Sequence, residues 1–178
     1  MKVVQSVIIA RPIEEVFAYR SALQNACEWQ PDVLASELAA PGLAGIGSRS
    51  TESRRGTNRT TESWDVEITE FKPNGVVGIV ARCGSVQVAE RHVFTADGGN
   101  TQYTLSVQMT GSPLTASAVQ RKTVEALVHF RRQIETPRVR TVPTRGHDRS
   151  ADPRHTAIRQ IKTRQPLTGA LSRKKCPI

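Results

Sequence analysis

Along the first 136 residues, apolar residues recur in some segments at the two-residue period of a strand and in others at the 3.6-residue period of a helix. The changes between these periods predict the order of elements. Lys2 to Ala10 is rich in Val and Ile and predicts a strand that Arg11-Pro12 ends. Ile13, Val16 and Phe17 then share one helical face, and Ser21 to Trp29 predicts a second short helix that ends before Pro31. The chain therefore begins with a strand followed by two short helices.

The middle of the chain predicts a series of antiparallel strands. Turn-forming pairs and runs recur at hairpin-like intervals, at Pro41-Gly42, 45–47, 73–75, Cys83-Gly84 and 97–100. After them, Ser112 as N-cap and Pro113 at the first helical position predict the start of a long amphipathic helix that runs to Thr136-Pro137. Its apolar face holds Ala116, Val119, Thr123, Leu127, Phe130 and Ile134.

This order of elements is an α+β pattern in which a long terminal helix packs on one face of a curved antiparallel sheet. The segment 6–17, SVIIARPIEEVF, resembles the opening of the polyketide cyclase/dehydrase and START-like (SRPBCC, Bet v 1-like) superfamily. Further similarities follow in order at WQP (29–31), GIGS (45–48), WDVEITEFKP (64–73) and GGNT (98–101). The resemblance covers residues 3–135. It implies a helix-grip fold with an apolar cavity for a lipid, polyketide or similar small molecule, and it implies no fixed catalytic set.

Strand alternation predicts which side chains line that cavity. On 102–109 the apolar phase, Tyr103 to Met109, has to point inward. If Gly98-Gly99 is a two-residue turn, Glu90 and His92 fall on the same inward face, opposite Val107 and Leu105. Glu90 and His92 are the two ionisable residues on an otherwise apolar face. This exception makes them the candidate catalytic residues.

Two interpretations of Glu90 and His92 stay open. Their spacing on one strand face is roughly 6 to 7 Å, which allows charge coupling or two contacts to one ligand. A Glu whose pKa is raised by burial and a nearby His would suit general acid–base chemistry of a cyclase or dehydratase. The alternative is structural, with the two side chains bonded to each other or hydrated at an open rim.

A further strand, 61–71, adds aromatic and acidic candidates. Trp64 lies on its inward phase with Val66 and Ile68, and Glu62 is in register near its end. Trp64 and Tyr103 are either core residues or ligand contacts, and the hydroxyl of Tyr103 needs a partner. The predicted ligand-binding set is Glu62, Trp64, Glu90, His92 and Tyr103.

The net charge of +9 does not belong to the predicted domain. Residues 1–136 hold 14 basic and 14 acidic residues, whereas residues 137–178 hold 11 basic and 2 acidic ones. The second segment has five of the ten prolines and none of the eight aromatic residues, so it predicts a basic, disordered tail. Such a tail allows binding to nucleic acid or an anionic membrane, although its lack of aromatics disfavours base stacking.

The sequence thus favours binding of a hydrophobic small molecule, with or without cyclase or dehydratase chemistry. The alternative is a protein or RNA interaction module that binds through the tail, in which the space inside the curved sheet is filled by ordinary core side chains. The sequence has no cluster of metal-ligating residues and no nucleotide-binding motif, so we expect no cofactor and no metal. Three distant cysteines and the lack of a long early apolar run favour a cytoplasmic protein. Ligand identity and oligomeric state are left open.

Overall fold

The computed structural model describes residues 1–56, 60–136 and 174–175. The chain divides into two units, one formed by Met1–Thr136 with Leu171–Ile178 and the other by Pro137–Ala170. The second unit, and most of the predicted basic tail with it, lies outside the described residues. Its disorder and its binding to nucleic acid or an anionic membrane therefore stay predictions.

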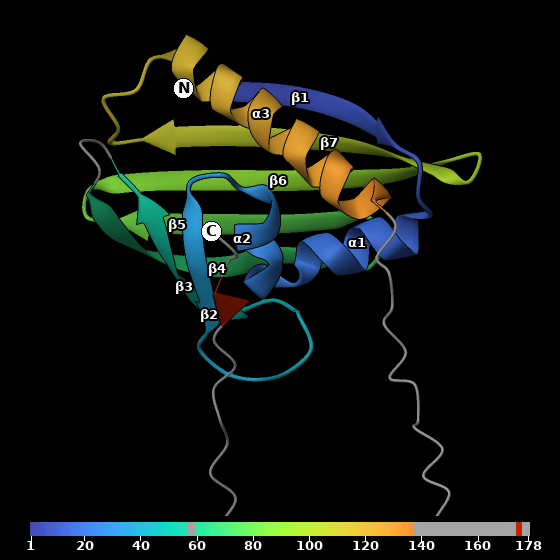
Figure 1. The fold of residues 1–178 in the computed structure, drawn as a ribbon, viewed down its shortest axis with the longest axis horizontal. Helices are drawn as coiled ribbons and strands as arrows, with labels where there is room; N and C mark the ends of the chain where they lie inside the picture. The colour runs from blue at the N-terminus through green and yellow to red at the C-terminus, as the bar shows by residue number, and fades with distance from the viewer. Residues whose placement is uncertain (57–59, 137–173, 176–178) are drawn as a thin grey trace, which may run out of the picture. The chain divides into compact units, whose positions relative to one another are not determined.

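The strands form one antiparallel sheet in the order β1-β7-β6-β5-β4-β3-β2-β8 (Figure 1). Their bounds are β1 (Lys2–Ile9), β2 (Val33–Leu38), β3 (Arg49–Arg55), β4 (Thr61–Lys72), β5 (Val76–Cys83), β6 (Val86–Asp97), β7 (Asn100–Thr110) and β8 (Lys174–Lys175). Strands β2 to β7 follow one another as a meander, and β1 pairs with the last of them. The two-residue β8 pairs with Ala35 and Ser36 of β2.

The first and last predicted helices are present, but the helix predicted over 21–29 is divided into a 3₁₀ turn and a four-residue α-helix. The helical elements are α1 (Ile13–Ser21), the 3₁₀ turn η1 (Leu23–Asn25), α2 (Ala26–Trp29) and α3 (Ala116–Glu135). The predicted cap of α3 at Ser112 is wrong, because Thr115 is the N-cap and its hydroxyl accepts a hydrogen bond from the Ala118 N–H at 3.3 Å. The Ser112 hydroxyl instead accepts from the Leu114 N–H within the preceding turn.

The β6–β7 hairpin has the predicted register. Asp97 pairs with Asn100, His92 with Leu105 and Glu90 with Val107. Gly98 and Gly99 form the turn with φ of +55° and +91°, which glycine adopts without a steric cost. The inward-pointing residues of both strands are buried or partly buried, as predicted, whereas Gln87, Arg91 and Thr95 on the opposite face of β6 are exposed.

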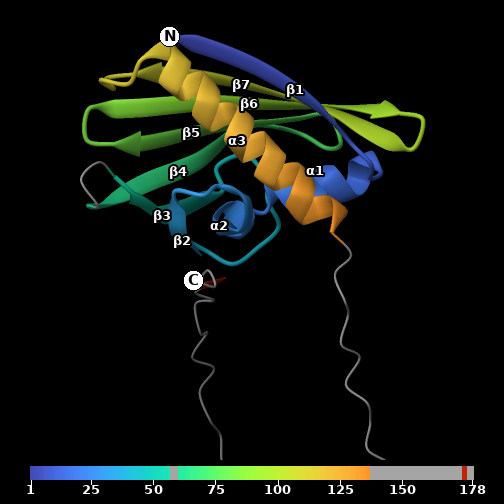
Figure 2. The same cartoon turned by 45° about the horizontal axis from the view of Figure 1, so that its top comes forward.

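The sheet curves around α3, which crosses it obliquely in front of β1 and β7 (Figures 1 and 2). Phe130 of α3 is fully buried and contacts the rings of Tyr19, Trp29 and Tyr103, at centroid distances of 5.4, 5.2 and 4.9 Å. This single ring therefore joins the terminal helix to α1, α2 and the sheet. The architecture is the α+β helix-grip fold that the sequence predicts.

Two findings concern the described residues as a whole. None of their helices has the length and apolar content needed to cross a membrane. Within the same residues, no three His, Cys, Asp or Glu side chains gather in a way that could hold a metal ion.

Candidate functional site

Four side chains meet on the concave face of the sheet beneath the end of α1. The Arg20 Nη2 donates to the Glu90 carboxylate at 3.1 Å and lies 2.6 Å from His92 Nε2. His92 Nδ1 lies 2.7 Å from the Tyr103 hydroxyl. Arg20, His92 and Tyr103 are buried, and the Glu90 side chain is 13% exposed. The group therefore holds one ion pair away from bulk water.

The surroundings keep His92 neutral at physiological pH. Burial disfavours the imidazolium and the adjacent Arg20 charge repels it, so that the pKa of His92 falls to about 4 despite the opposing effect of Glu90. A neutral imidazole has one N–H, and its position sets which contacts are hydrogen bonds. With the proton on Nδ1, His92 donates to Tyr103 and accepts from Arg20. With the proton on Nε2, it donates to Glu90.

Glu90 has the opposite shift to the one expected from the sequence. Burial alone would raise its pKa, but hydrogen bonding and charge from His92, together with Arg20 and Arg54, lower the pKa to about 2. Glu90 is therefore a permanent carboxylate near neutral pH and not a general acid. Burial raises the pKa of the Tyr103 phenol, which stays protonated.

A second buried ion pair lies on β3, which is separated from β6 by β4 and β5 in the sheet. Glu52 accepts a hydrogen bond from Arg54 Nε at 2.8 Å, and its carboxylate lies 2.7 Å from Arg54 Nη2. Burial raises the pKa of the Glu52 carboxyl, against the lowering effect of Arg54. The Glu90 charge also affects both Glu52 and Arg54, so the two ion pairs act on each other. We call Arg20, Glu52, Arg54, Glu90, His92 and Tyr103 the inner polar cluster.

Each tryptophan of the chain lies against one arginine of the inner polar cluster. The guanidinium carbon of Arg20 is 4.8 Å from the ring centroid of Trp29, and that of Arg54 is 4.9 Å from that of Trp64. Trp64 also donates from Nε1 to Glu62 at 3.2 Å. Both arginines thus have a carboxylate on one side and an aromatic face on another, which offsets part of the cost of burying their charge.

The five predicted ligand-binding residues fall into two adjoining groups. His92 contacts both Glu90 and Tyr103, whereas the register predicts only that the three lie on the same face. Glu62 and Trp64 lie together on β4 beside the Glu52–Arg54 pair. Their common use by a ligand stays a prediction.

Sequence reasoning missed Arg20, Glu52 and Arg54. Arg20 lies three and four residues after Phe17 and Val16, and this spacing places it on the buried face of α1. That spacing was a usable signal. Glu52 and Arg54 gave none, because β3 has the sequence RSTESRR and contains no apolar residue to show which phase points inward.

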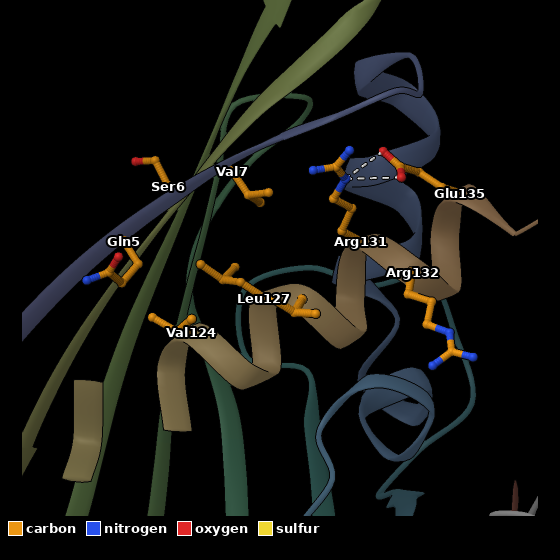
Figure 3. A pocket seen from close by; sticks show the side chains of 9 residues that line it. Gln5, Ser6, Val7, Val124, Leu127, Arg131, Arg132 and Glu135 are labelled. Atoms are coloured by element: carbon orange, nitrogen blue, oxygen red, sulfur yellow. Dashed lines mark hydrogen bonds and ion pairs between the residues drawn. The ribbon is translucent and has the colours of Figure 1, made fainter. Parts of the chain in front are cut away.

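An open groove lies between β1 and α3 (Figure 3). Its volume is about 440 Å³, within the range of small-molecule sites. We call it the β1–α3 groove, and it is lined by Gln5, Ser6, Val7, Val124, Leu127, Val128, Arg131, Arg132 and Glu135. A second pocket is lined by Leu34, Arg55, Thr60 and Thr61. Neither of these two pockets is lined by the predicted ligand-binding residues.

A single layer of side chains lies between the β1–α3 groove and the inner polar cluster. Val7 in the groove pairs with Tyr103 in the β1–β7 ladder, on the inward phase of both strands. Tyr103 in turn packs on Phe130 and reaches His92 with its hydroxyl. The Tyr103 ring therefore separates the groove from the buried charges.

The curved antiparallel sheet, the short helices after β1 and the long C-terminal helix define the class of START-like helix-grip proteins. Residues 1–135 match the family described as polyketide cyclase / dehydrase and lipid transport, and the chain belongs to this family. No curated protein sequence matches the chain.

Solved structures with the same fold have little sequence in common with the chain. The Zhui aromatase/cyclase from Streptomyces sp. R1128 is 14% identical with a TM-score of 0.63, over 76% of this chain and 93% of that one. A START superfamily protein from Mycobacterium smegmatis is 13% identical with a TM-score of 0.61, over 75% and 94%. A protein from Thermus thermophilus is 16% identical with a TM-score of 0.62, over 75% and 97%. Family membership supports the binding of a hydrophobic small molecule in general terms.

Proposed function

We propose that the chain binds a hydrophobic small molecule between the sheet and α3, with the apolar part of the ligand in the β1–α3 groove. The observation that carries the proposal is the groove itself, whose volume is about 440 Å³ and whose walls include Val7, Val124 and Leu127. Val124 is 42% exposed although it is apolar. An apolar concavity with a few polar groups at its rim is the usual form of a small-molecule site.

The inner polar cluster and the neighbouring Ser50 support a second polar contact for the same ligand, on the far side of Tyr103 from the groove. The Ser50 hydroxyl, on the inward phase of β3 with Glu52, is buried and has no hydrogen-bond partner among the described residues. A buried polar atom without a partner is costly unless a ligand or water atom satisfies it. In this proposal a ligand that reaches Glu90 or His92 displaces the Tyr103 side chain and replaces its hydroxyl as partner of His92.

The binding proposal is tested with a matched pair of substitutions on α3. Val124→Trp fills the groove, whereas Glu125→Trp adds the same side chain at the next position, which is exposed and does not line the groove. Nile red is a suitable probe because it is apolar and uncharged. We expect Val124→Trp to weaken Nile red binding at least tenfold and Glu125→Trp to change it less than twofold. Absence of binding to the unsubstituted chain, or equal effects of both substitutions, would refute the proposal.

Acid–base chemistry at Glu90 and His92 is the finer form of this proposal. At neutral pH the lowered pKa values make Glu90 a carboxylate and His92 a neutral imidazole, which is the form that accepts a proton. His92 is a weak base while Arg20 lies beside it, so proton abstraction from a carbonyl substrate requires Arg20 to move away. Binding is therefore the better supported function.

Two substitutions separate catalysis from binding. Glu90→Gln and His92→Phe should abolish turnover of a poly-β-ketone substrate, with affinity little changed, if these residues transfer protons. The same substitutions should alter only affinity if the residues orient a ligand. No turnover by the unsubstituted chain would rule out the catalytic form and leave the binding proposal intact.

A further inference from the structure

We propose that the β1–α3 groove selects an amphiphile with a carboxylate head group and that Arg131 binds this head group. This inference rests on the proposed function, because it names the class of molecule that the groove takes. The groove is apolar along Val7, Val124, Leu127 and Val128, and its charged residues, Arg131, Arg132 and Glu135, gather at the C-terminal end of α3. A ligand with one apolar and one charged end matches this division.

Arg131 is held in place with part of its guanidinium unused. Its Nε donates to both oxygens of the Glu135 carboxylate, at 3.2 and 3.1 Å. The two terminal Nη groups have no hydrogen-bond partner among the described residues, and the side chain is 52% exposed. In Figure 3 the guanidinium lies on the side of α3 that faces β1, near Val7, whereas Arg132 points away from β1. Arg131 therefore presents two fixed donors at the groove, which is the geometry that a carboxylate accepts.

The Glu135 carboxylate is shared among several donors, and this end of the groove keeps a net positive charge. Its carboxylate also accepts from the Ala10 N–H at 2.7 Å, and Arg11 donates to the backbone carbonyls of Ile134 and Glu135 at 3.1 and 2.9 Å. Partial burial opposes ionisation, but these donors and Arg131 lower the pKa of Glu135. Arg11 thus satisfies carbonyls at the end of α3 that would otherwise repel an anion.

The local charge count favours a singly charged head group. Arg11, Arg131 and Arg132 carry three positive charges, while Glu15, which lies 3.9 Å from Arg11, and Glu135 carry two negative ones. The net charge is 3 − 2 = +1. From Val124 to Arg131 the helix rises roughly 10 Å, which leaves an apolar wall long enough for several methylene groups.

The experiment compares dodecanoate with 1-dodecanol, two chains of the same length that differ in the charge of the head group. Both compete with Nile red at neutral pH, below the concentration at which dodecanoate forms micelles. Arg131→Gln should weaken dodecanoate about tenfold and 1-dodecanol less than twofold, since a hydrogen bond to a charged group is lost. The matched control is Arg121→Gln, which removes the same charge from an exposed position of α3 outside the groove.

The outcomes separate this inference from the proposed function. If Nile red binds but Arg131→Gln weakens both competitors equally or neither, carboxylate recognition by Arg131 is wrong and groove binding stands. If Arg121→Gln has the same effect as Arg131→Gln, the selectivity reflects net charge alone and the inference fails. If neither Nile red nor either competitor binds, both proposals fail together.

Discussion

The guanidinium of Arg20 lies 2.6 Å from the imidazole of His92; both side chains are buried, and they lie 3.1 and 3.2 Å from the same Glu90 oxygen. Burial and the adjacent cation both favour the neutral ring. Arg20 thus balances the Glu90 charge and, together with burial, keeps His92 neutral.

The first prediction concerns the free energy of unfolding. Arg20→Met leaves the buried Glu90 carboxylate without its ion-pair partner, and we expect a loss of about 3 to 5 kcal/mol in urea denaturation. Adding Glu90→Gln to Arg20→Met should recover part of this loss. The control is Arg91→Met, which removes the exposed Arg91–Glu70 pair and should cost less than about 1 kcal/mol. Equal losses at the two sites would contradict a buried charge balance.

The second prediction concerns the pH dependence of stability. In the unfolded chain His92 has its ordinary pKa of 6.5, and folding lowers the pKa to about 4. The unfolded state therefore binds the proton first as the pH falls, so this contribution is complete above 6.5 and is lost between 6.5 and 4. Glu90, with a pKa lowered from 4.5 to about 2, adds a loss over that lower range.

The matching measurement is the unfolding free energy at several pH values, with His92→Phe as the comparison. The substitution should flatten the curve between pH 6.5 and 4, and it should also weaken the decline below pH 4.5, because His92 has the largest share in lowering the pKa of Glu90. An unchanged slope in the upper range would show that His92 is not the group that titrates there.

The third prediction tests the corrected start of α3. Thr115→Ala removes the hydroxyl that accepts from the Ala118 N–H, and it should lower the unfolding free energy by about 1 kcal/mol. Ser112→Ala should have a smaller effect, because the Ser112 hydroxyl bonds within the turn and caps no helix. A larger cost at Ser112, measured by urea denaturation, would restore the cap that the sequence predicts.

The fourth prediction compares two glycines with positive φ. At Gly111, with φ of +72°, an added Cβ would collide with the Ser85 carbonyl oxygen, whereas at Gly98, with φ of +55°, it would meet nothing within 4 Å. Gly98→Ala should cost about 1 to 2 kcal/mol from the backbone conformation alone. Gly111→Ala should cost clearly more and lower the midpoint of thermal unfolding further. Similar midpoints would argue against close approach of the chain at Gly111.

Much of the fold could be predicted because the spacing of apolar residues and the positions of turn-forming residues indicate the same elements along the chain. Gly98-Gly99 sets the register of the last hairpin, and that register places Glu90 and His92 on the buried face with Tyr103. The start of α3 could not be placed as well, since Ser112-Pro113 and Thr115 are both acceptable caps in sequence.

The site was harder to predict because several of its charged residues lie on elements in which apolar and polar residues do not alternate clearly. Alternation identifies a polar residue as an exception only where its neighbours on the same face are apolar, as around His92. On β3 the whole inward phase, Ser50, Glu52 and Arg54, is polar, so no exception stands out. The direction of the Glu90 shift also depends on Arg20, which is 70 residues away in sequence.

Tyr103 forms a wall one aromatic ring thick, with Val7 of the groove beside it in the ladder, Phe130 packed on its ring and the His92 imidazole at its hydroxyl. The side chain cannot swing out of this position without breaking the contact between its hydroxyl and His92. Occupation of the groove that moves Tyr103 would consequently register as a chemical-shift change at the His92 ring nitrogens. Through Tyr103, binding of an apolar ligand in the groove would thus change the electrostatic environment of the buried charges.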